Sequence, residues 1–312
     1  MKRTLFLLAL AATLLFPPRS PAYGVTGPTC AGTVSSAKCL KQVQAFNCDF
    51  DDNIFVTPAR IMVWNRATLK ETGFSTAEWS LVKEKIGKEH PWKDFVLRPD
   101  GLRYFGDTSP AGLDLFKQQI EQALGDGNWK GPSWNAFKEA MSRPSTRRHT
   151  TIITARMHSP EAILRGLQVL VDRGLLPALP DKENLYAVLW PGFPERFIGK
   201  DSAESKAKVM LHLLDQIEAT PVPGNASWVE DREGTGRAKL HLWGFSDDDF
   251  GNFAKALEVL SREVARGRWP HVKISLFFTG LNHPLERPRS LVIRYDGTTR
   301  PTLPVEATRM GR

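Results

Sequence analysis

The stretch AFNCDFDDNIFVTP, residues 45–58, decides the fold of this chain, because three carboxylates follow directly on a short apolar run. These acids are Asp49, Asp51 and Asp52. Desolvating an uncompensated charge costs several kcal/mol, so buried strands rarely end in a cluster of acids. Where they do, the acids usually lie at the carboxyl edge of an open α/β sheet, which is where such sheets bind ligands. The alternative is an acidic turn that simply follows a strand.

A cluster of acids at a strand end also predicts a metal. Carboxylates crowded into one site repel one another unless a hard cation neutralises them, and oxygen-rich clusters suit Mg²⁺. Asp49 and Asp51, two residues apart, would flank one reacting position. One of them could attack while its neighbour moves a proton.

Two later segments end or begin in groups that suit the same chemistry. HTTIITARMHSPE, residues 149–161, ends a β-branched run in Thr154. DSAESKAKVMLHLLDQIE, residues 201–218, reads as an amphipathic helix with Lys206 and Lys208 near its start. Each segment has a structural alternative, because Thr154 alone could satisfy a strand end and one of the two lysines is expected to be solvated.

A final segment completes a set of four motifs. AKLHLWGFSDDDFGNF, residues 238–253, ends a strand in Asp247, Asp248 and Asp249. The set, in this order, resembles the haloacid dehalogenase (HAD) superfamily, whose motifs are D-x-D, a Ser or Thr ending the second strand, a Lys and a late acidic pair. The resemblance spans roughly residues 43–280. It implies a Mg²⁺-dependent phosphomonoester hydrolase that acts on a small-molecule phosphate ester.

The resemblance also implies a role for each residue. Asp49 would attack phosphorus and become an aspartyl phosphate, and Asp51 would protonate the leaving alcohol and then activate water. The Thr154 hydroxyl would hold the phosphoryl oxygens, and Lys206 would supply a fixed positive charge. Lys206 is preferred over Lys208 because it fits the family's spacing to the apolar positions that follow. The implied metal ligands are Asp49, the backbone carbonyl of Asp51, Asp247 and Asp248.

Two departures from the family's pattern affect this reading. Asn53 stands where the family usually has Thr or Val, and Gly244-Phe245 precedes the late acids where a Gly-Asp pair is usual. The second departure blurs which acids bind metal, and we expect Asp249 to cap the following helix. Four further residues near the motifs are second candidates for the site: Asp52, Asn53, Arg156 and His158.

The alternation of apolar runs and helical patterns predicts an α/β three-layer sandwich with a parallel central sheet, the HAD-like Rossmannoid fold. Its core would comprise residues 43–56 and 147–296, followed by a flexible tail at 297–312. The expected strands are 43–50, 149–155, 184–191, 238–245, 271–278 and 290–296. The expected helices are 159–173, 202–218 and 249–266.

Residues 57–146 interrupt this alternation and form an inserted region. RIMVWN followed by TLKETGFS predicts a strand pair, and a capping-box pattern begins a helix at residues 75–79. Residues 113–124 and 133–141 read as amphipathic helices. The region is either a cap over the site or a plain elaboration of the core. Four tryptophans in it would form a small core or line a pocket: Trp79, Trp92, Trp129 and Trp134.

The N-terminus resembles a secretory signal peptide over residues 1–23, with an uncleaved anchor as the alternative. A segment at 24–42 would link it to the core, and the protein would be periplasmic or secreted. In an oxidising compartment Cys30 and Cys39 could form a disulfide, whereas Cys48 is expected to be a small buried hydrophobe.

Composition sets the remaining limits. The 312 residues are 41% hydrophobic and 24% charged, which are ordinary globular values. The net charge of +8 favours anionic substrates. RPSTRRH at 143–149 is the one basic candidate for nucleic-acid binding, and a solvated turn explains it equally well. Two rival functions stay open: a HAD-like binding protein without turnover, and a phosphotransferase with an acceptor other than water.

Overall fold

The structure is a computed structural model, and it describes residues 43–107, 114–220, 241–280, 290–294 and 297–301. The expected signal peptide, the segment at 24–42 and the Cys30–Cys39 pair lie outside these residues. Cys48 is buried and its thiol is free, as expected. Among the described helices, none has both the length and the apolar character needed to cross a membrane.

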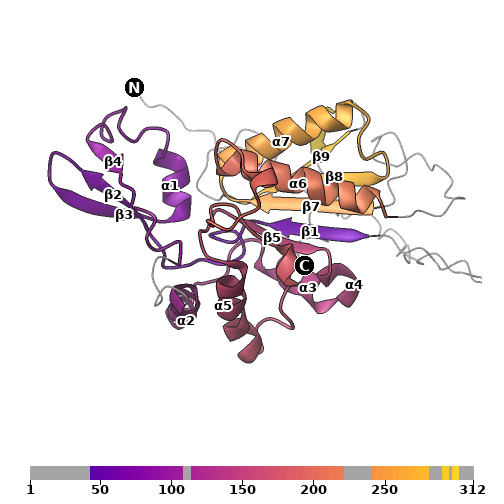
Figure 1. The fold of residues 1–312 in the computed structure, drawn as a ribbon, viewed down its shortest axis with the longest axis horizontal. Coiled ribbons are helices and arrows are strands. Elements are labelled where there is room, and N and C mark those ends of the chain that lie inside the picture. The colour runs from indigo at the N-terminus through magenta and orange to yellow at the C-terminus, as the bar shows by residue number, and fades with distance from the viewer. Residues whose placement is uncertain (1–42, 108–113, 221–240, 281–289, 295–296, 302–312) are drawn as a thin grey trace, which may run out of the picture. The chain divides into compact units, whose positions relative to one another are not determined.

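A seven-stranded sheet forms the centre of the fold, in the order β10-β9-β8-β7-β1-β5-β6 (Figure 1). The five strands from β8 to β6 are parallel, whereas β9 and β10 are antiparallel at one edge. The predicted α/β class is confirmed, and the sheet is mixed rather than wholly parallel. The strands are β1 (Gln44–Cys48), β5 (Thr150–Thr154), β6 (Leu185–Ala187), β7 (His241–Asp247), β8 (Val272–Phe278), β9 (Ser290–Ile293) and β10 (Thr299–Pro301).

The antiparallel edge corrects one expectation. We expected residues 297–312 to be a flexible tail, but Thr299–Pro301 pairs with β9 as a short strand. Only residues 294–298 separate β9 from β10, so this pairing is local in the sequence and needs no apolar run of its own. The rest of the expected tail, residues 302–312, lies outside the described residues.

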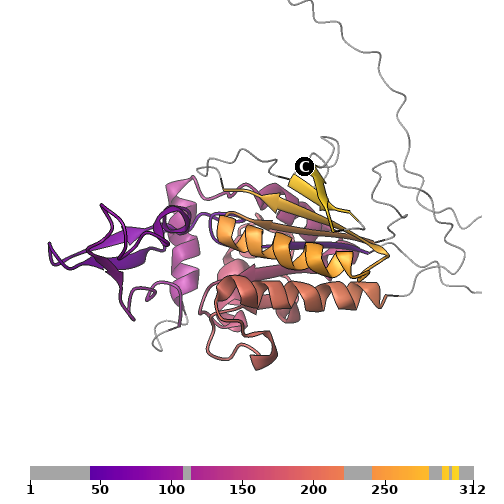
Figure 2. The same cartoon turned by 90° about the horizontal axis from the view of Figure 1, so that it is seen from above.

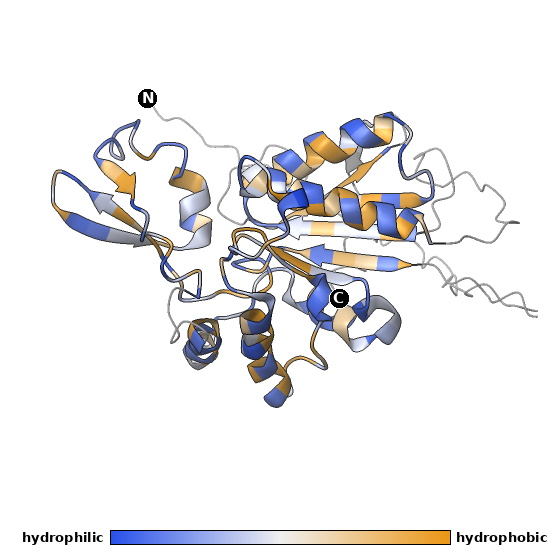
Figure 3. Cartoon of the chain, viewed as in Figure 1, coloured by the Kyte–Doolittle hydropathy of each residue, from blue (hydrophilic) through white to orange (hydrophobic). Residues whose placement is uncertain are grey.

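Helices cover both faces of the sheet (Figures 1 and 2). On one face lie α6 (Ser202–Glu218) and α7 (Phe250–Ala265), which pack against each other. Hydrophobic and hydrophilic residues alternate along both helices (Figure 3), as expected for helices with one face on a sheet. The other face carries α2 (Leu115–Asp126), α3 (Trp134–Ser142), α4 (Pro144–Arg147) and α5 (Pro160–Asp172). Two short 3₁₀ helices complete the connections, at Lys182–Asn184 and Glu195–Phe197.

The central strands are buried on both faces because their side chains alternate between two cores. In β5, Ile152 belongs to the core beneath α2, α3 and α5, while Ile153 belongs to the core beneath α6 and α7. In β1, Ala45 and Phe46 divide in the same way. This is the period of two that a pleated strand imposes. It explains why the parallel strands read as continuous apolar runs in the sequence.

The predicted insertion at 57–146 divides into two parts. Residues 57–107, which we call the cap module, form an antiparallel sheet in the order β3-β2-β4 and one helix. The expected strand pair and the capping box of Ser75 and Glu78 are present. The later helices belong to the core instead: α3 packs on β1 and β5, α2 packs on α5, and Trp129 and Trp134 join the same hydrophobic cluster. The cap-module elements are β2 (Ile61–Asn65), β3 (Lys70–Phe74), α1 (Thr76–Val82) and β4 (Phe95–Leu97).

The contact between α2 and α5 predicts the effect of one methyl group. A Cβ at Gly166 would lie 2.2 Å from a ring carbon of Phe116, which is fully buried. Overpacking of this kind costs about 1–3 kcal/mol and should outweigh the helix propensity that alanine adds. We expect Gly166→Ala to lower the free energy of unfolding in urea. Gly125→Ala, on the exposed face of α2 with no neighbour within 4 Å, should raise it by about 0.5–1 kcal/mol. Equal effects of the two substitutions would contradict this packing.

Candidate active site

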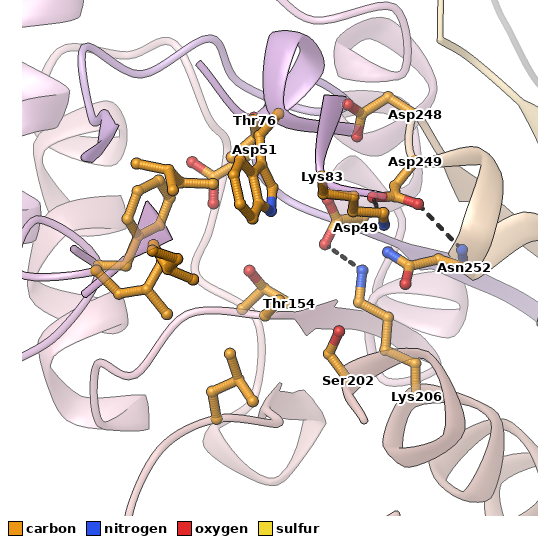
Figure 4. A pocket seen from close by; sticks show the side chains of 17 residues that line it. Asp49, Asp51, Thr76, Lys83, Thr154, Ser202, Lys206, Asp248, Asp249 and Asn252 are labelled. Atoms are coloured by element: carbon orange, nitrogen blue, oxygen red, sulfur yellow. Dashed lines mark hydrogen bonds and ion pairs between the residues drawn. The ribbon is translucent and has the colours of Figure 1, made fainter. Parts of the chain in front are cut away.

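Three central strands end at one place and set the position of the candidate site. Asp49 follows β1 directly, Thr154 ends β5 and Asp247 ends β7. The strands are in register, because Cys48 lies opposite both Ile152 and Ser246. A pocket of about 180 Å³ lies between these strand ends and the cap module. Figure 4 shows Asp49, Thr154 and Lys206 converging on it.

Lys206 reaches the acids from the second turn of α6. Its side chain is buried, and its Nζ donates to Asp49 Oδ1 at 2.7 Å and to Asp247 Oδ2 at 2.8 Å. Lys206 shares a helix face with Val209 and Met210, three and four residues later, and both are fully buried. Lys208 lies off this face and donates instead to the Ile198 carbonyl at 2.7 Å. The structure therefore brings Lys206, and not Lys208, to the acids.

A cluster of three buried carboxylates lies beside Lys206. Ligand oxygens of Asp49, Asp247 and Asp248 all lie within 4.8 Å of one another, so the cluster could hold a metal ion. Among the described residues, none donates a hydrogen bond to the carboxylate of Asp248. Three carboxylates and one ammonium leave two negative charges when all are ionised. A divalent cation would balance that charge.

Burial and mutual repulsion shift the acids toward their neutral forms in the absence of a cation. Burial raises the pKa of Asp49 to about 8, although the charge of Lys206 opposes the shift. Burial, with the charges of Asp49 and Asp247, also raises the pKa of Asp248 well above its ordinary value. Burial alone would lower the pKa of Lys206, but Asp247 and Asp49 outweigh it and raise that pKa. The lysine therefore stays charged, and the site without metal favours protons on its acids.

The third late acid has a different position, as we expected. Asp249 is the N-cap of α7, and its Oδ1 accepts from the backbone amides of Gly251 at 2.7 Å and Asn252 at 3.2 Å. Its Oδ2 pairs with Lys83 of the cap module at 2.6 Å. The Asp249 carboxylate thus fastens the cap module to the start of α7.

Asp51 is held away from the acid cluster by an ion pair. Its two carboxylate oxygens accept from Arg156 at 2.6 Å and 2.8 Å, and Thr57 donates to one of them at 2.9 Å. Arg156 is fully buried, and its guanidinium lies over the ring of Phe116 at 4.6 Å. Arg156, a second candidate for the site, therefore pairs with an acid. The Asp51 side chain is not part of the three-carboxylate cluster.

Asn53 connects the loop after β1 to β7 and to the chain before α3. Its side-chain amide donates to the carbonyls of Asp49 and Ser246, both at 3.0 Å. Its side-chain oxygen accepts from Ser133 at 2.7 Å and from Thr279 at 2.8 Å. A threonine or valine could not make this set of bonds, because neither offers two donors and a carbonyl oxygen. Asn53 thus has a structural role at this position.

The remaining candidates divide between pocket and support. Thr154 lines the pocket, and its buried hydroxyl has no hydrogen-bond partner among the described residues. Asp52, in the left-handed conformation with φ of 53°, accepts from the Thr76 hydroxyl and from the Ala77 amide at 2.8 Å. His158 is buried beside Arg156, and it does not line the pocket.

Sequence reasoning missed several residues of the site. Thr57, Lys83 and Ser133 bond the acids or the loop after β1, yet each is a single polar residue in a stretch that contains no motif. Only their partners, far away in the chain, give them a role. Ser202 and Asn252, at the starts of α6 and α7, also line the pocket. Their helix-start positions next to the motifs were the one signal available.

The chain was compared with protein families, curated proteins and solved structures, and none of these matches it. Interpretation of the site therefore rests on its own residues and geometry.

The bonds of Asn53 predict a large effect of truncation. Asn53→Ala would leave the side chains of Ser133 and Thr279 and two buried carbonyls without this partner, at about 1–3 kcal/mol for each group left unsatisfied. We expect a loss of about 2–4 kcal/mol in the free energy of unfolding, measured in denaturant. Asn184→Ala is the control, because Asn184 makes one exposed hydrogen bond to the Arg148 carbonyl. A loss no larger than the control's would show that Asn53 does not hold the loop.

Proposed function

We propose that this chain is a Mg²⁺-dependent phosphomonoester hydrolase of the haloacid dehalogenase type, acting through an aspartyl-phosphate intermediate. The observation that carries the proposal is the position of Asp49. It lies at the carboxyl end of the central strand, between Lys206 and two further buried acids, and beside the unpartnered Thr154 hydroxyl. The α/β sheet and the order of the four motifs along the chain support the same assignment.

The donor set fits Mg²⁺. Mg²⁺ prefers hard oxygen ligands and is usually held by a few carboxylates together with water. Asp49, Asp247 and Asp248 supply such oxygens, and one lysine leaves two of their charges unbalanced. The backbone carbonyl of Asp51 was a further expected ligand. When bound, Mg²⁺ would neutralise charge on the phosphoryl oxygens and bring the phosphate close to an anionic nucleophile.

Asp49 is arranged to act as the nucleophile. Lys206 donates to Oδ1 of Asp49, whereas no described residue donates to Oδ2. In the proposed reaction a carboxylate oxygen of Asp49 forms a bond to phosphorus while the bond from phosphorus to the ester oxygen breaks. Water then attacks the phosphoryl group, which leaves as inorganic phosphate and restores the Asp49 carboxylate. The Thr154 hydroxyl would donate to a phosphoryl oxygen, which explains an otherwise costly buried hydroxyl.

Asp51 would move the protons in both steps. It would give a proton to the leaving alcohol and take one from the attacking water. Its Oδ1 accepts from both Arg156 and Thr57, whereas its Oδ2 accepts from Arg156 alone and keeps a lone pair that could take a proton. The ion pair with Arg156 is also the observation that favours the rival function, a metal- or ligand-binding protein without turnover.

Secretion or a periplasmic location remains part of the proposal and depends on residues 1–23.

Magnesium should stabilise the protein, and more so as the pH rises. The folded-state pKa of Asp49, about 8, lies above its ordinary value of 3.8, so without metal this group's contribution to stability is present below pH 3.8 and is lost as the pH rises through 8. Mg²⁺ binds the ionised form and should remove this loss. At a concentration about 100-fold above Kd it should add about 2.7 kcal/mol.

The measurement is the thermal midpoint with and without Mg²⁺, at pH about 5 and at pH about 8, with ionic strength matched by a monovalent salt. We expect a larger upward shift at the higher pH, and a reduced shift in Asp248→Asn. A shift that does not depend on pH, or that survives in Asp248→Asn unchanged, would contradict metal binding by this cluster.

Neutralising each acid of the D-x-D motif should change activity in a different way. Asp49→Asn removes the attacking oxygen while keeping the shape, so the variant should show essentially no turnover. Asp51→Asn keeps the nucleophile and loses proton transfer, which contributes about 10²–10⁴-fold. Aryl phosphates need less protonation of the leaving group and should lose less in the first step than alkyl phosphates. Release of the alcohol or phenol in a single turnover measures the first step, and phosphate release measures the whole cycle. Equal residual activities of both variants on both ester types would argue against these roles.

A further inference from the structure

The pocket has two chemically different walls. Asp49, Thr154 and Lys206 lie on the core wall, together with the polar residues that begin α6 and α7. The wall from the cap module is apolar, and its hydrophobic residues come from β2, α1, β4 and the segment that follows β4. These residues are Ile61, Trp79, Leu97, Leu102 and Phe105.

The apolar character continues to the mouth of the pocket. Leu97 of the cap module is 37% exposed and Leu189 of the core is 38% exposed, and both line the pocket. Among the described residues only six large hydrophobic side chains are exposed, and two of these six lie at this one pocket. Exposed apolar surface at a cavity costs free energy unless a ligand covers it.

The polar side chains on the cap wall already have partners. The Thr76 hydroxyl donates to Asp52, and Lys83 pairs with Asp249 at 2.6 Å. Among the described cap-module residues that line the pocket, the indole N–H of Trp79 is the other donor, and the Lys83 ammonium keeps N–H groups beyond the one that bonds Asp249. The rest of this wall offers carbon alone, so a sugar or a second phosphate placed against Ile61, Leu97 and Phe105 would lose hydrogen bonds to water without replacement.

We infer that the phosphomonoester bound here has a compact apolar leaving group, an aromatic ring or a group of similar size, and that the cap wall binds it. The inference rests on the proposed function for the phosphoryl half of the substrate. The pocket volume of about 180 Å³ has to hold the phosphoryl group as well, which limits the leaving group to a compact one. Trp79 offers an aromatic leaving group a flat partner, and aromatic pairs of this kind attract one another beyond the effect of the area buried.

The test compares esters of the same kind of alcohol whose leaving groups differ in polarity. Benzyl, ethyl and glycerol phosphates are all esters of primary alcohols. We expect kcat/KM for benzyl phosphate to exceed that for glycerol phosphate by a factor of about 10 or more. Trp79→Ala and Leu97→Ser should lower kcat/KM for benzyl phosphate by a larger factor than kcat/KM for glycerol phosphate, and so remove most of this preference. Trp64→Ala is the matched control, because Trp64 lies in β2 and does not line the pocket.

Binding of benzylphosphonate and ethylphosphonate, which are not hydrolysed, separates this inference from the proposed function. If no ester is hydrolysed but benzylphosphonate binds more tightly, and Trp79→Ala and Leu97→Ser weaken it, the apolar subsite stands and the hydrolase assignment falls. If esters are hydrolysed with no preference for benzyl phosphate, or with a preference that both variants retain, the subsite is overturned and the hydrolase stands. Neither hydrolysis nor tighter binding of benzylphosphonate overturns both.

Discussion

The structure depends on the burial of three carboxylates around one lysine. Asp49, Asp247 and Asp248 lie within a few ångströms of one another at the ends of the central strands, and Lys206 bonds two of them. This arrangement requires that β1 and β7 end at the same level and that α6 begin one turn before its lysine. It also leaves an excess of negative charge, which is costly in a buried site unless a cation or protons balance it. The cluster could therefore hold a metal ion.

The loop after β1 gives each of its polar residues a separate partner. Asp49 faces Lys206, Asp51 pairs with Arg156, Asp52 binds the start of α1, and Asn53 bonds the chain around β7. Repulsion among the acids of this loop is reduced because only Asp49 joins the three-carboxylate cluster. The helix α1 is joined to the core at its start through Asp52 and just past its end through Lys83 and Asp249. The position of the cap module is thereby linked to the same loops that form the site.

Local patterns predicted much of this arrangement, and long-range contacts account for the rest. The apolar runs that became β1, β5 and β7, and the cap signals at Ser75 and Asp249, act over a few residues and could be read directly. The division of residues 57–146 into a cap module and core helices could not be predicted. The sequence of an amphipathic helix such as α2 reveals its apolar face but not the element that packs against that face. The pairing of Asp51 with Arg156 spans 105 residues, so no local pattern fixes it. The role of Asn53 depends on Ser133 and Thr279 for the same reason.

Anomalous scattering from crystals grown with Mn²⁺ in place of Mg²⁺ tests the central claim most directly, because Mn²⁺ takes the same oxygen ligands and reveals its own position. The charge balance predicts one strong peak per chain, at metal–ligand distance from carboxylate oxygens of Asp49 and of Asp247 or Asp248, and with Lys206 still bonded to the cluster. A site without a peak at saturating Mn²⁺, or a peak elsewhere in the chain alone, would contradict it.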